Sequence, residues 1–432
     1  MAVTRWVRAI GSRIRRRPFT FGLGCVGALV LAIIAIPVLL ILLFAVLITF
    51  SDSLPKSEYA SFNPAIPRQL LEIKDGSVNF WDVTDGDSPK LNASFPDLNA
   101  DAKRRMFEVQ ARETASFSPD GKYAAVGCSD GSVYLFENLD GKITDTCLAE
   151  LNEKISCVAF SADSMTLATG TERGTLSLWN LGESPESLPS NQLEAEVREI
   201  AFSPKNQYFI ALTHNRGEGA SIHLFNRDGY SSTFETISLA DSPSIAFHPS
   251  GDYFLYRSSQ GVLQLMRIIE SNEMNSVTVA QPPLVDFGGC LEFSEDGKYL
   301  ASTGQCANEM IWNVANHETM TPMIIAPGQS KFDSFPNSIH QVNFFPDNTT
   351  IAYVKWQSDL YIHSLATGPI VGPILTHKDG VVSMSISSDG ALIATVGMTG
   401  SCRIWNQNGT PFADFARREA ASALVRAWFN LQ

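Results

Sequence analysis

The residue pattern with the clearest link to chemistry is Gly-Cys-Ser-Asp-Gly at residues 127–131. It satisfies G-x-S-x-G, the pattern in which a strand-to-helix elbow exposes a nucleophilic serine. Here it lies between two predicted strands, and Asp-Gly is a pair favoured in β-hairpin turns. The sequence therefore predicts a turn at this point and no catalytic serine.

Patterns for metals and cofactors are weaker still. Residues 82–87 begin like a calcium loop, but Ala93 stands where such a loop needs a bidentate Glu, so we expect a solvated turn. The seven histidines show no paired spacing, and the seven cysteines include no Cys-x-x-Cys motif. An isolated disulfide stays open as an alternative to small buried thiols at four predicted strand positions: Cys128, Cys157, Cys290 and Cys402. The sequence predicts no metal, no cofactor and no enzyme activity.

These residues belong to a repeat that runs from about residue 60 to residue 407. Each copy has an apolar anchor, and the anchors are spaced by 43, 42, 45, 46, 51 and 42 residues: Phe117, Phe160, Phe202, Phe247, Phe293, Phe344 and Ile386. Another strand ends 19 residues after most anchors, at Phe136, Trp179, Met266, Trp312, His363 and Trp405. The exception is Phe225, 23 residues after its anchor, and a degenerate copy from Phe62 to Trp81 precedes the others. Repeats of roughly 40–45 residues that hold several short strands predict a β-propeller.

Each copy consists of short strands separated by turns. Residues 155–160 alternate like a strand, residues 161–164 are typical of a turn, and residues 167–170 and 175–179 form two further strands. A fourth strand is expected before the next anchor. One such sheet cannot bury both faces alone, so it must stack on its neighbours, and radial closure then removes exposed edges.

The repeat resembles the WD-repeat family. The resemblance rests on Phe-Ser-Pro-Asp-Gly at 117–121, Trp-Asp at 81–82, and Trp-Asn at 179–180, 312–313 and 405–406. It covers most of residues 58–410 and implies four-stranded blades used mainly as a platform for protein partners. The family's Gly-His pair before the first strand is almost absent, and only residues 376–381 approach it. The resemblance therefore does not extend to the buried hydrogen-bond network of that histidine in most blades. Related propellers with Ser-Pro-Asp-Gly turns also occur in periplasmic and lactonase-like proteins.

We therefore predict an all-β fold, a β-propeller of seven or eight four-stranded blades over residues 58–415. Counting the degenerate first copy gives eight blades, which we favour because its Asp-Gly-Ser-Val aligns without a gap to residues 130–133. Pro67 argues for seven, because a missing donor near the start of a strand is tolerated only at a sheet edge.

A basic segment and a long apolar segment precede the propeller. Residues 1–17 carry six arginines and no acidic residue, and the 32 residues from 19 to 50 carry no charge. A helix of that length spans roughly 48 Å, more than the ~30 Å hydrocarbon core of a bilayer. We predict a cytoplasmic tail at residues 1–17, one transmembrane anchor at residues 18–50, a linker at residues 51–57 and the propeller on the extracytoplasmic side. A cleaved signal peptide is the alternative, although the apolar segment is too long and ends without a small-residue cleavage site.

The chain after residue 50 is acidic, with 26 basic residues against 45 acidic ones and a formal charge of −19. This charge argues against a nucleic-acid partner and against lying flat on anionic lipid. Residues 416–432 carry apolar side chains at spacings of three and four, which predicts an amphipathic helix. Docking on the propeller is the favoured position of this helix, with the membrane interface or a partner helix as the second choice.

Irregularities in the repeat mark candidate binding loops, because binding concentrates on loops held by a rigid scaffold. The third full unit has four extra residues between its second and third strands, the connection after Trp312 is the longest, and the sixth unit places a tryptophan at a turn that is elsewhere Ser or Glu. Family geometry implies that all three lie on one face, although drift of surface loops is the alternative. The candidate partner-binding residues are His214, Arg216, Glu218, Phe332, Phe335 and Trp356.

The sequence thus predicts a membrane-tethered, non-catalytic propeller that acts as a scaffold or recognition platform for a protein partner. Its oligomeric state is left open. The alternative is a propeller enzyme or small-ligand receptor that uses the central channel. The first-strand positions expected to face that channel carry no charge, which disfavours this alternative: Ala115, Cys157, Ser244 and Met384.

Overall fold

The computed structural model divides the chain into two units, Met1–Leu54 and Pro55–Gln432, and the residues it describes all belong to the second unit. These are residues 57–96, 114–215, 219–226, 231–235, 244–257, 263–268, 274–280, 291–302, 308–316, 319–327, 339–355, 359–375, 377, 380–397 and 400–414, except residues 75, 140 and 183. Every regular element among them is a β-strand, as the repeat predicts.

The described strands form eight antiparallel sheets, numbered here in chain order. Sheets 1 to 4 comprise β1 (Ser57–Phe62), β2 (Gln69–Lys74), β3 (Ser77–Asp82) and β4 (Lys90–Phe95); β5 (Ala115–Phe117), β6 (Tyr123–Gly127), β7 (Ser132–Leu139) and β8 (Lys142–Glu150); β9 (Ile155–Phe160), β10 (Thr166–Thr171), β11 (Thr175–Asn180), β12 (Glu186–Ser187) and β13 (Asn191–Gln192); and β14 (Glu196–Phe202), β15 (Tyr208–Asn215), β16 (Gly219–Asn226) and β17 (Ser231–Glu235).

Sheets 5 to 8 follow the same plan. They comprise β18 (Ile245–Phe247), β19 (Tyr253–Arg257), β20 (Leu263–Ile268) and β21 (Met274–Ala280); β22 (Leu291–Phe293), β23 (Tyr299–Ser302), β24 (Asn308–Asn316) and β25 (Thr319–Pro327); β26 (Ile339–Phe344), β27 (Thr350–Lys355), β28 (Asp359–Ser364) and β29 (Gly368–Leu375); and β30 (Val381–Ile386), β31 (Leu392–Gly397), β32 (Cys402–Asn406) and β33 (Pro411–Asp414). In sheet 3 the fourth strand is split, and β12 and β13 both pair with β11.

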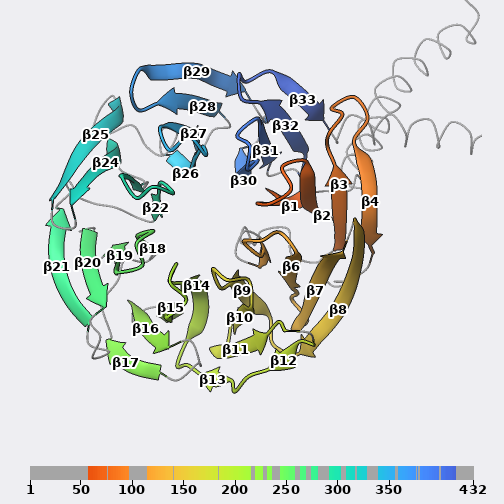
Figure 1. Ribbon diagram of the computed structural model, residues 1–432, viewed down its shortest axis with the longest axis vertical. Coiled ribbons are helices and arrows are strands. Elements are labelled where there is room, and N and C mark those ends of the chain that lie inside the picture. The colour runs from red at the N-terminus through yellow and green to blue at the C-terminus, as the bar shows by residue number, and fades with distance from the viewer. Residues whose placement is uncertain are drawn as a thin grey trace, which may run out of the picture. The chain divides into compact units, whose positions relative to one another are not determined.

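The eight sheets are arranged around a central opening, with the first strand of each innermost and the last outermost (Figure 1). Each first strand ends on the anchor residue that the sequence marks, from Phe62 in β1 to Ile386 in β30. The anchors end the strands because turn-forming residues follow them directly. The sequence prediction of strand order within a copy is therefore confirmed.

Apolar side chains from neighbouring sheets pack together at each junction. Because successive side chains of a strand point to opposite faces, one strand serves two junctions. On β2, Leu70 joins a buried cluster with Leu392 and Ile404 of sheet 8, whereas Leu71 joins one with Val126 and other residues of sheet 2. Both faces of the central strands are thus buried, and β2, β10 and β31 show no exposed position.

A repeated turn between first and second strands explains the Ser-Pro-Asp-Gly phrase. In sheet 2 the Ser118 amide donates to the Tyr123 carbonyl at 2.9 Å, and the Ser118 hydroxyl donates to Asp120 Oδ1 at 2.6 Å. The Tyr123 amide in turn donates to Ser118 Oγ at 2.9 Å. The same hydroxyl-to-carboxylate bond recurs at the matching turns of sheets 3, 6 and 8. Ser and Asp therefore fix the turn through local side-chain hydrogen bonds.

These turns also touch from sheet to sheet, and we call the resulting ring of contacts the turn belt. The fourth residue of seven of these turns has a positive φ: Gly121, Ser164, Asn206, Gly251, Gly297, Asn348 and Gly390. Where it is not glycine, its side chain accepts the Asp amide of the preceding turn, as in Asp163 N to Asn206 Oδ1 at 3.2 Å and Asp296 N to Asn348 Oδ1 at 3.3 Å.

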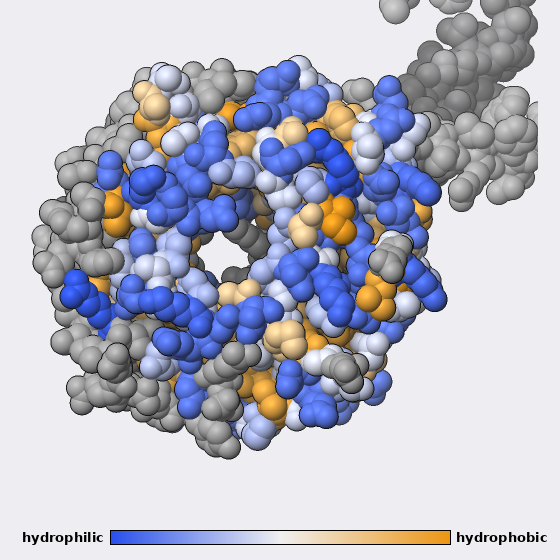
Figure 2. Space-filling view, viewed as in Figure 1, coloured by the Kyte–Doolittle hydropathy of each residue, from blue (hydrophilic) through white to orange (hydrophobic). Residues whose placement is uncertain are grey.

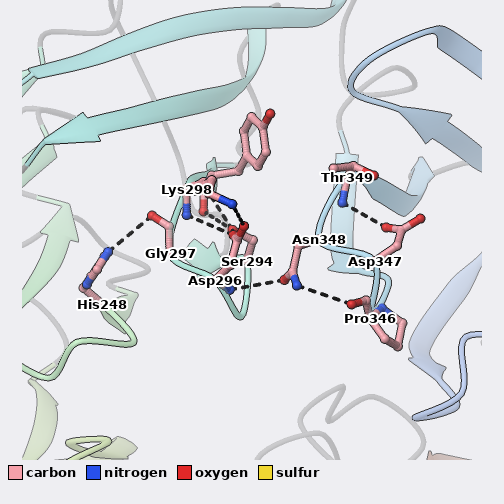
Figure 3. A network of polar contacts seen from close by, with 10 residues as sticks. His248, Ser294, Asp296, Gly297, Lys298, Pro346, Asp347, Asn348 and Thr349 are labelled. Carbon is pink, nitrogen blue, oxygen red and sulfur yellow. Dashed lines mark hydrogen bonds and ion pairs between the residues drawn. The ribbon is translucent and has the colours of Figure 1, made fainter.

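Where the fourth residue is glycine, the preceding turn supplies the side chain instead. Asn63 Nδ2 donates to the Gly121 carbonyl at 2.8 Å, and His248 Nε2 lies 3.3 Å from the Gly297 carbonyl. Figure 3 shows the part of the belt between sheets 5 and 7. Arg68 of sheet 1 pairs with Asp389 of sheet 8 at 3.0 Å, so the belt links the first sheet to the last.

The termini of the chain hold several predictions that the structure does not test. The described part of the chain contains no helical segment with the length and hydropathy of a membrane span. The predicted tail at residues 1–17, the anchor at residues 18–50 and the amphipathic helix at residues 416–432 lie outside the described residues. Each of them stays a prediction.

Candidate functional site

The two ends of the ring carry different connections. Strands alternate in direction within each sheet. One end of every sheet, here called the lower end, therefore carries the turn between the first and second strands and the turn between the third and fourth strands. The turns between second and third strands and the connections from one sheet to the next lie at the other, the upper end. The turn belt shows that all sheets share this orientation, since the matching turns touch. Candidate loops at the upper end are therefore carried on one framework.

The topology assigns all three sequence irregularities to the upper end. The extra residues of the third full unit fall between β15 and β16, the long connection between β25 and β26, and the tryptophan turn between β27 and β28. Five of the six candidates lie outside the described residues: Arg216, Glu218, Phe332, Phe335 and Trp356. Their role in partner binding stays a prediction.

His214, the sixth candidate, is expected in a loop, but it lies in a strand. It pairs with Ala220, and Asn215 pairs with Gly219, so the ladder continues to the tip of the hairpin. The extra residues therefore lengthen β15 and β16 and leave only residues 216–218 for the turn. The physical reason is that backbone pairing continues for as long as both strands offer partners in register. The described part of this hairpin is therefore paired backbone up to Asn215 and Gly219.

A histidine close to this hairpin is buried. The Thr213 hydroxyl lies 2.9 Å from His223 Nε2, and His223 is 8% exposed. Burial lowers the pKa of His223, and the nearby Glu194 carboxylate opposes this shift. The imidazole is therefore neutral at neutral pH.

Sequence reasoning missed a polar cluster on sheet 3 at the upper end. Glu153 Oε2 accepts the hydroxyls of Thr171 and Thr175, each at 2.9 Å, and Lys154 Nζ contacts Glu172 Oε1 at 2.6 Å. The sequence signal for this cluster was a Glu-Lys pair directly before the first strand of the sheet, followed by threonines on both sides of the next upper turn. The cluster joins the upper turn of sheet 3 to the connection that enters it.

The family's histidine network is present in the last sheet. His377 Nδ1 lies 2.7 Å from Ser401 Oγ, His377 Nε2 lies 3.0 Å from Thr395 Oγ1, and Trp405 Nε1 donates to Thr395 Oγ1 at 2.9 Å. In sheet 3 the equivalent position is Leu151, so the network is absent there. The expectation from the Thr-His-Lys-Asp-Gly sequence is therefore confirmed in this sheet.

The candidate chemistry at residues 127–131 is a hairpin turn. Gly127 ends β6 and Ser132 begins β7, and the Cys128 amide donates to the Ser132 carbonyl at 2.8 Å. Cys128 is buried but lies one residue beyond the strand in which the sequence places it, because the hairpin turn begins there. Among the described residues, no group of three or more His, Cys, Asp or Glu side chains is arranged to hold a metal ion.

The expected channel lining is partly wrong. Ala115 and Met384 line a pocket among the first strands, as predicted. Cys157 instead points into the buried junction between sheets 3 and 4, while its neighbour Val158 lines the pocket. The reason is strand alternation: Cys157 and Val158 face opposite sides of β9.

Comparison with known proteins agrees with this architecture. Residues 113–137, 145–180 and 370–406, whose described strands belong to sheets 2, 3, 7 and 8, match the family described as WD domain, G-beta repeat. The WD repeat-containing protein 26 homolog of Drosophila melanogaster is 28% identical over 185 residues, which cover 41% of this chain and 26% of that protein. Rat apoptotic protease-activating factor 1 is 19% identical over 291 residues, which cover 67% of this chain and 21% of that protein.

Solved structures show the fold. Sqt1 from Chaetomium thermophilum superposes with a TM-score of 0.61 at 14% identity, over 82% of this chain and 96% of that one. The β-propeller domain of Cps50 (Swd1) from Myceliophteria thermophila gives a TM-score of 0.51 at 18% identity, over 68% of this chain and 96% of that one. The WD40 repeats and the WD-repeat relatives together support a WD-repeat β-propeller family for this chain. The chain spans less than two thirds of the length of these curated relatives.

Proposed function

We propose that this protein is a membrane-tethered, non-catalytic WD-repeat propeller of eight blades that serves as a scaffold for a protein partner. WD-repeat relatives support a protein-interaction role, and one solved neighbour, Sqt1, is bound to the N-terminus of the ribosomal protein L10. That complex is an example of a structural neighbour that binds the N-terminus of another protein. The partner of this chain is unidentified, and the loops of the chain itself are the features that select it.

The observation that supports the proposal is the strand order, in which the three irregular segments all connect strands at the upper end of their sheets. The β15–β16 hairpin is paired to its tip. The β24–β25 hairpin has two strands of nine residues, Asn308–Asn316 and Thr319–Pro327, and leads into the long connection. A stiff framework lowers the entropy lost when its loops bind a partner. Aromatic residues on such loops are the side chains that most often dominate binding.

The test is cross-linked affinity capture of the full-length protein from its native membrane. The parent is compared with a variant in which Phe332, Phe335 and Trp356 are changed to Ala. We expect a partner that the parent recovers and the variant loses, while both unfold at the same temperature. Identical recovery by both proteins would overturn the upper-end proposal.

The chain offers a matched control at the lower end. Ile66, Leu139 and Met165 are large apolar residues that are 41%, 50% and 41% exposed, and all three lie at lower-end turns of sheets 1 to 3. Changing these three residues to Ala removes a similar apolar area from the opposite end. The control variant should still recover the partner. If only the control variant failed to recover it, the binding site would lie at the lower end.

The tether and the side of the membrane are tested with a thiol probe. Cys147 on β8 is an exposed free thiol, whereas Cys128, Cys157 and Cys402 are buried. With the other cysteines outside the described residues changed to Ser, a membrane-impermeant maleimide should label intact cells through Cys147. A Cys147→Ser variant supplies the background, and labelling that requires permeabilised cells would contradict an extracytoplasmic propeller.

A further inference from the structure

A pocket with a volume of about 240 Å³ lies among the innermost strands of sheets 1, 2, 3, 7 and 8. It opens on the central opening that Figure 2 shows, rimmed mainly by hydrophilic and neutral residues. Its polar lining comes chiefly from Ser61, Ser116, Ser383, Ser385 and Asn343, and no charged side chain lines it. A pocket this small and polar does not suit a drug-sized apolar ligand, which needs a larger and mostly apolar site.

Ser385 Oγ accepts the Phe62 amide at 3.1 Å and Asn343 Oδ1 accepts Gln341 Nε2 at 2.7 Å, whereas the other three pocket serines make fewer hydrogen bonds. Ser383 is 3% exposed and lines the pocket, yet its hydroxyl has no hydrogen bond to the described residues. Ser61 Oγ lies 3.4 Å and Ser116 Oγ 3.2 Å from the next residue's carbonyl, which is long for hydroxyl donors. Hydroxyl groups that face the pocket with few hydrogen bonds of their own are available to a ligand that hydrogen-bonds.

The polar lining is confined to one arc of the ring. The residue before the anchor is Ser61, Ser116, Asn343 or Ser385 in sheets 1, 2, 7 and 8, and in sheet 6 it is Glu292, whose carboxylate lies 3.4 Å from Asn343 Nδ2. In sheets 3, 4 and 5 the same position is alanine: Ala159, Ala201 and Ala246. The pocket therefore has a built, one-sided set of hydrogen-bonding groups.

We propose that this pocket binds a small neutral polyhydroxylated molecule, a polyol or monosaccharide. Hydroxyl groups both donate and accept, so serine and asparagine side chains pair with them in either direction. A charged ligand would lose hydration without a counter-charge in the lining, and an apolar ligand would leave Ser383 without a partner. This site is separate from the upper-end loops and does not depend on the scaffold function.

The experiment is saturation-transfer NMR on the purified full-length protein, with myo-inositol and D-glucose as neutral probes and D-gluconate as a charged analogue. We expect transfer to at least one neutral probe and none to gluconate. Ser383→Ala removes one ligand hydrogen bond and should weaken the measured Kd about fivefold. Because that hydroxyl makes no hydrogen bond to the part of the chain that the structure describes, the variant should unfold at the same temperature as the parent or higher.

Ser187→Ala, at an exposed position on β12, is the matched control and should bind like the parent. Absence of transfer to both neutral probes would overturn the proposal. An unchanged Kd for Ser383→Ala would show that the probe binds outside this pocket. Equal binding of gluconate would contradict the neutral ligand class.

Discussion

Thr395 is the residue that joins Trp405 to His377, and its role can be isolated. It is fully buried, and its hydroxyl contacts His377 Nε2 and Trp405 Nε1. Thr395→Val keeps the side-chain shape but leaves both nitrogens without this partner. Loss of a buried hydrogen bond whose other partner stays in place costs about 1–3 kcal/mol, so for two such bonds we expect a loss of roughly 2–6 kcal/mol in the free energy of unfolding by chemical denaturation.

The same position in sheet 3 supplies the control. Thr169 stands nine residues after its anchor, as Thr395 does, and is also fully buried. Its hydroxyl has no hydrogen-bond partner in the described part of the chain. Thr169→Val should therefore leave stability unchanged or raise it, since an unsatisfied polar group is replaced by an apolar one. Equal losses in the two variants would show that side-chain packing, not the network, governs both sites.

His223 makes stability depend on pH. Burial lowers its pKa in the folded protein below the ordinary value of 6.5. Between that value and the lower folded pKa, the unfolded chain binds more protons, so stability rises with pH there and falls on acidification. We expect the unfolding temperature of the parent to fall more steeply than that of His223→Gln as the pH drops below about 6.5. Parallel curves for the two proteins would contradict a buried, neutral His223.

At the scale of the turn, the left-handed residues of the turn belt have two roles that substitutions can separate. Asn206 has a φ of 57°, and its side chain accepts the Asp163 amide of the preceding sheet. Asn206→Gly keeps the backbone conformation and loses the hydrogen bond, which should cost about 0.5–1.5 kcal/mol. Asn206→Ala adds left-handed strain of about 1–2 kcal/mol. The unfolding temperature should be highest for the parent, lower for Asn206→Gly and lowest for Asn206→Ala. Equal unfolding temperatures for the two variants would contradict backbone strain in Asn206→Ala.

The strands themselves could be predicted because the information is local. Each first strand ends at its anchor because a variant of the turn sequence follows it, and in sheet 2 the Ser118 and Asp120 side chains make the hydrogen bonds of that turn. The histidine network was likewise visible at residues 376–381. The Gly-Cys-Ser-Asp-Gly hairpin followed from its turn chemistry and from the strands on both sides.

Contacts between sheets could not be predicted, because they join residues of separate repeats. The Asn206 contact with Asp163 depends on how sheets 3 and 4 align. The prediction that Cys157 faces the channel was wrong because one step along β9 moves a side chain to the opposite face of the strand. The sequence predicts a loop at His214 because the pattern of a single sequence does not show how far the hydrogen-bonded pairing of two strands extends.

For the molecule as a whole, the decisive question is whether the first sheet closes the ring against the last. Ala60, Phe62 and Leu70 share a buried cluster with residues of β31 and β32. The Phe62 amide also donates to Ser385 Oγ at 3.1 Å. Each of these two sheets is built entirely from its own end of the chain. Side-chain packing and these polar contacts, not a shared strand, therefore hold the junction together.

Two adjacent leucines on β2 test this closure by hydrogen exchange of the full-length protein. Leu70 faces sheet 8 and Leu71 faces sheet 2, and both are buried. Leu70→Ala should cost about 2–5 kcal/mol and speed exchange in β31 and β32, more than 300 residues away in the chain. Leu71→Ala should have a similar cost but speed exchange in β6 and β7 instead. An eight-bladed ring requires this crossed pattern, because only closure brings the first and last sheets into one core. If Leu70→Ala left β31 and β32 unchanged, the first sheet would lie outside the ring, and seven blades would remain.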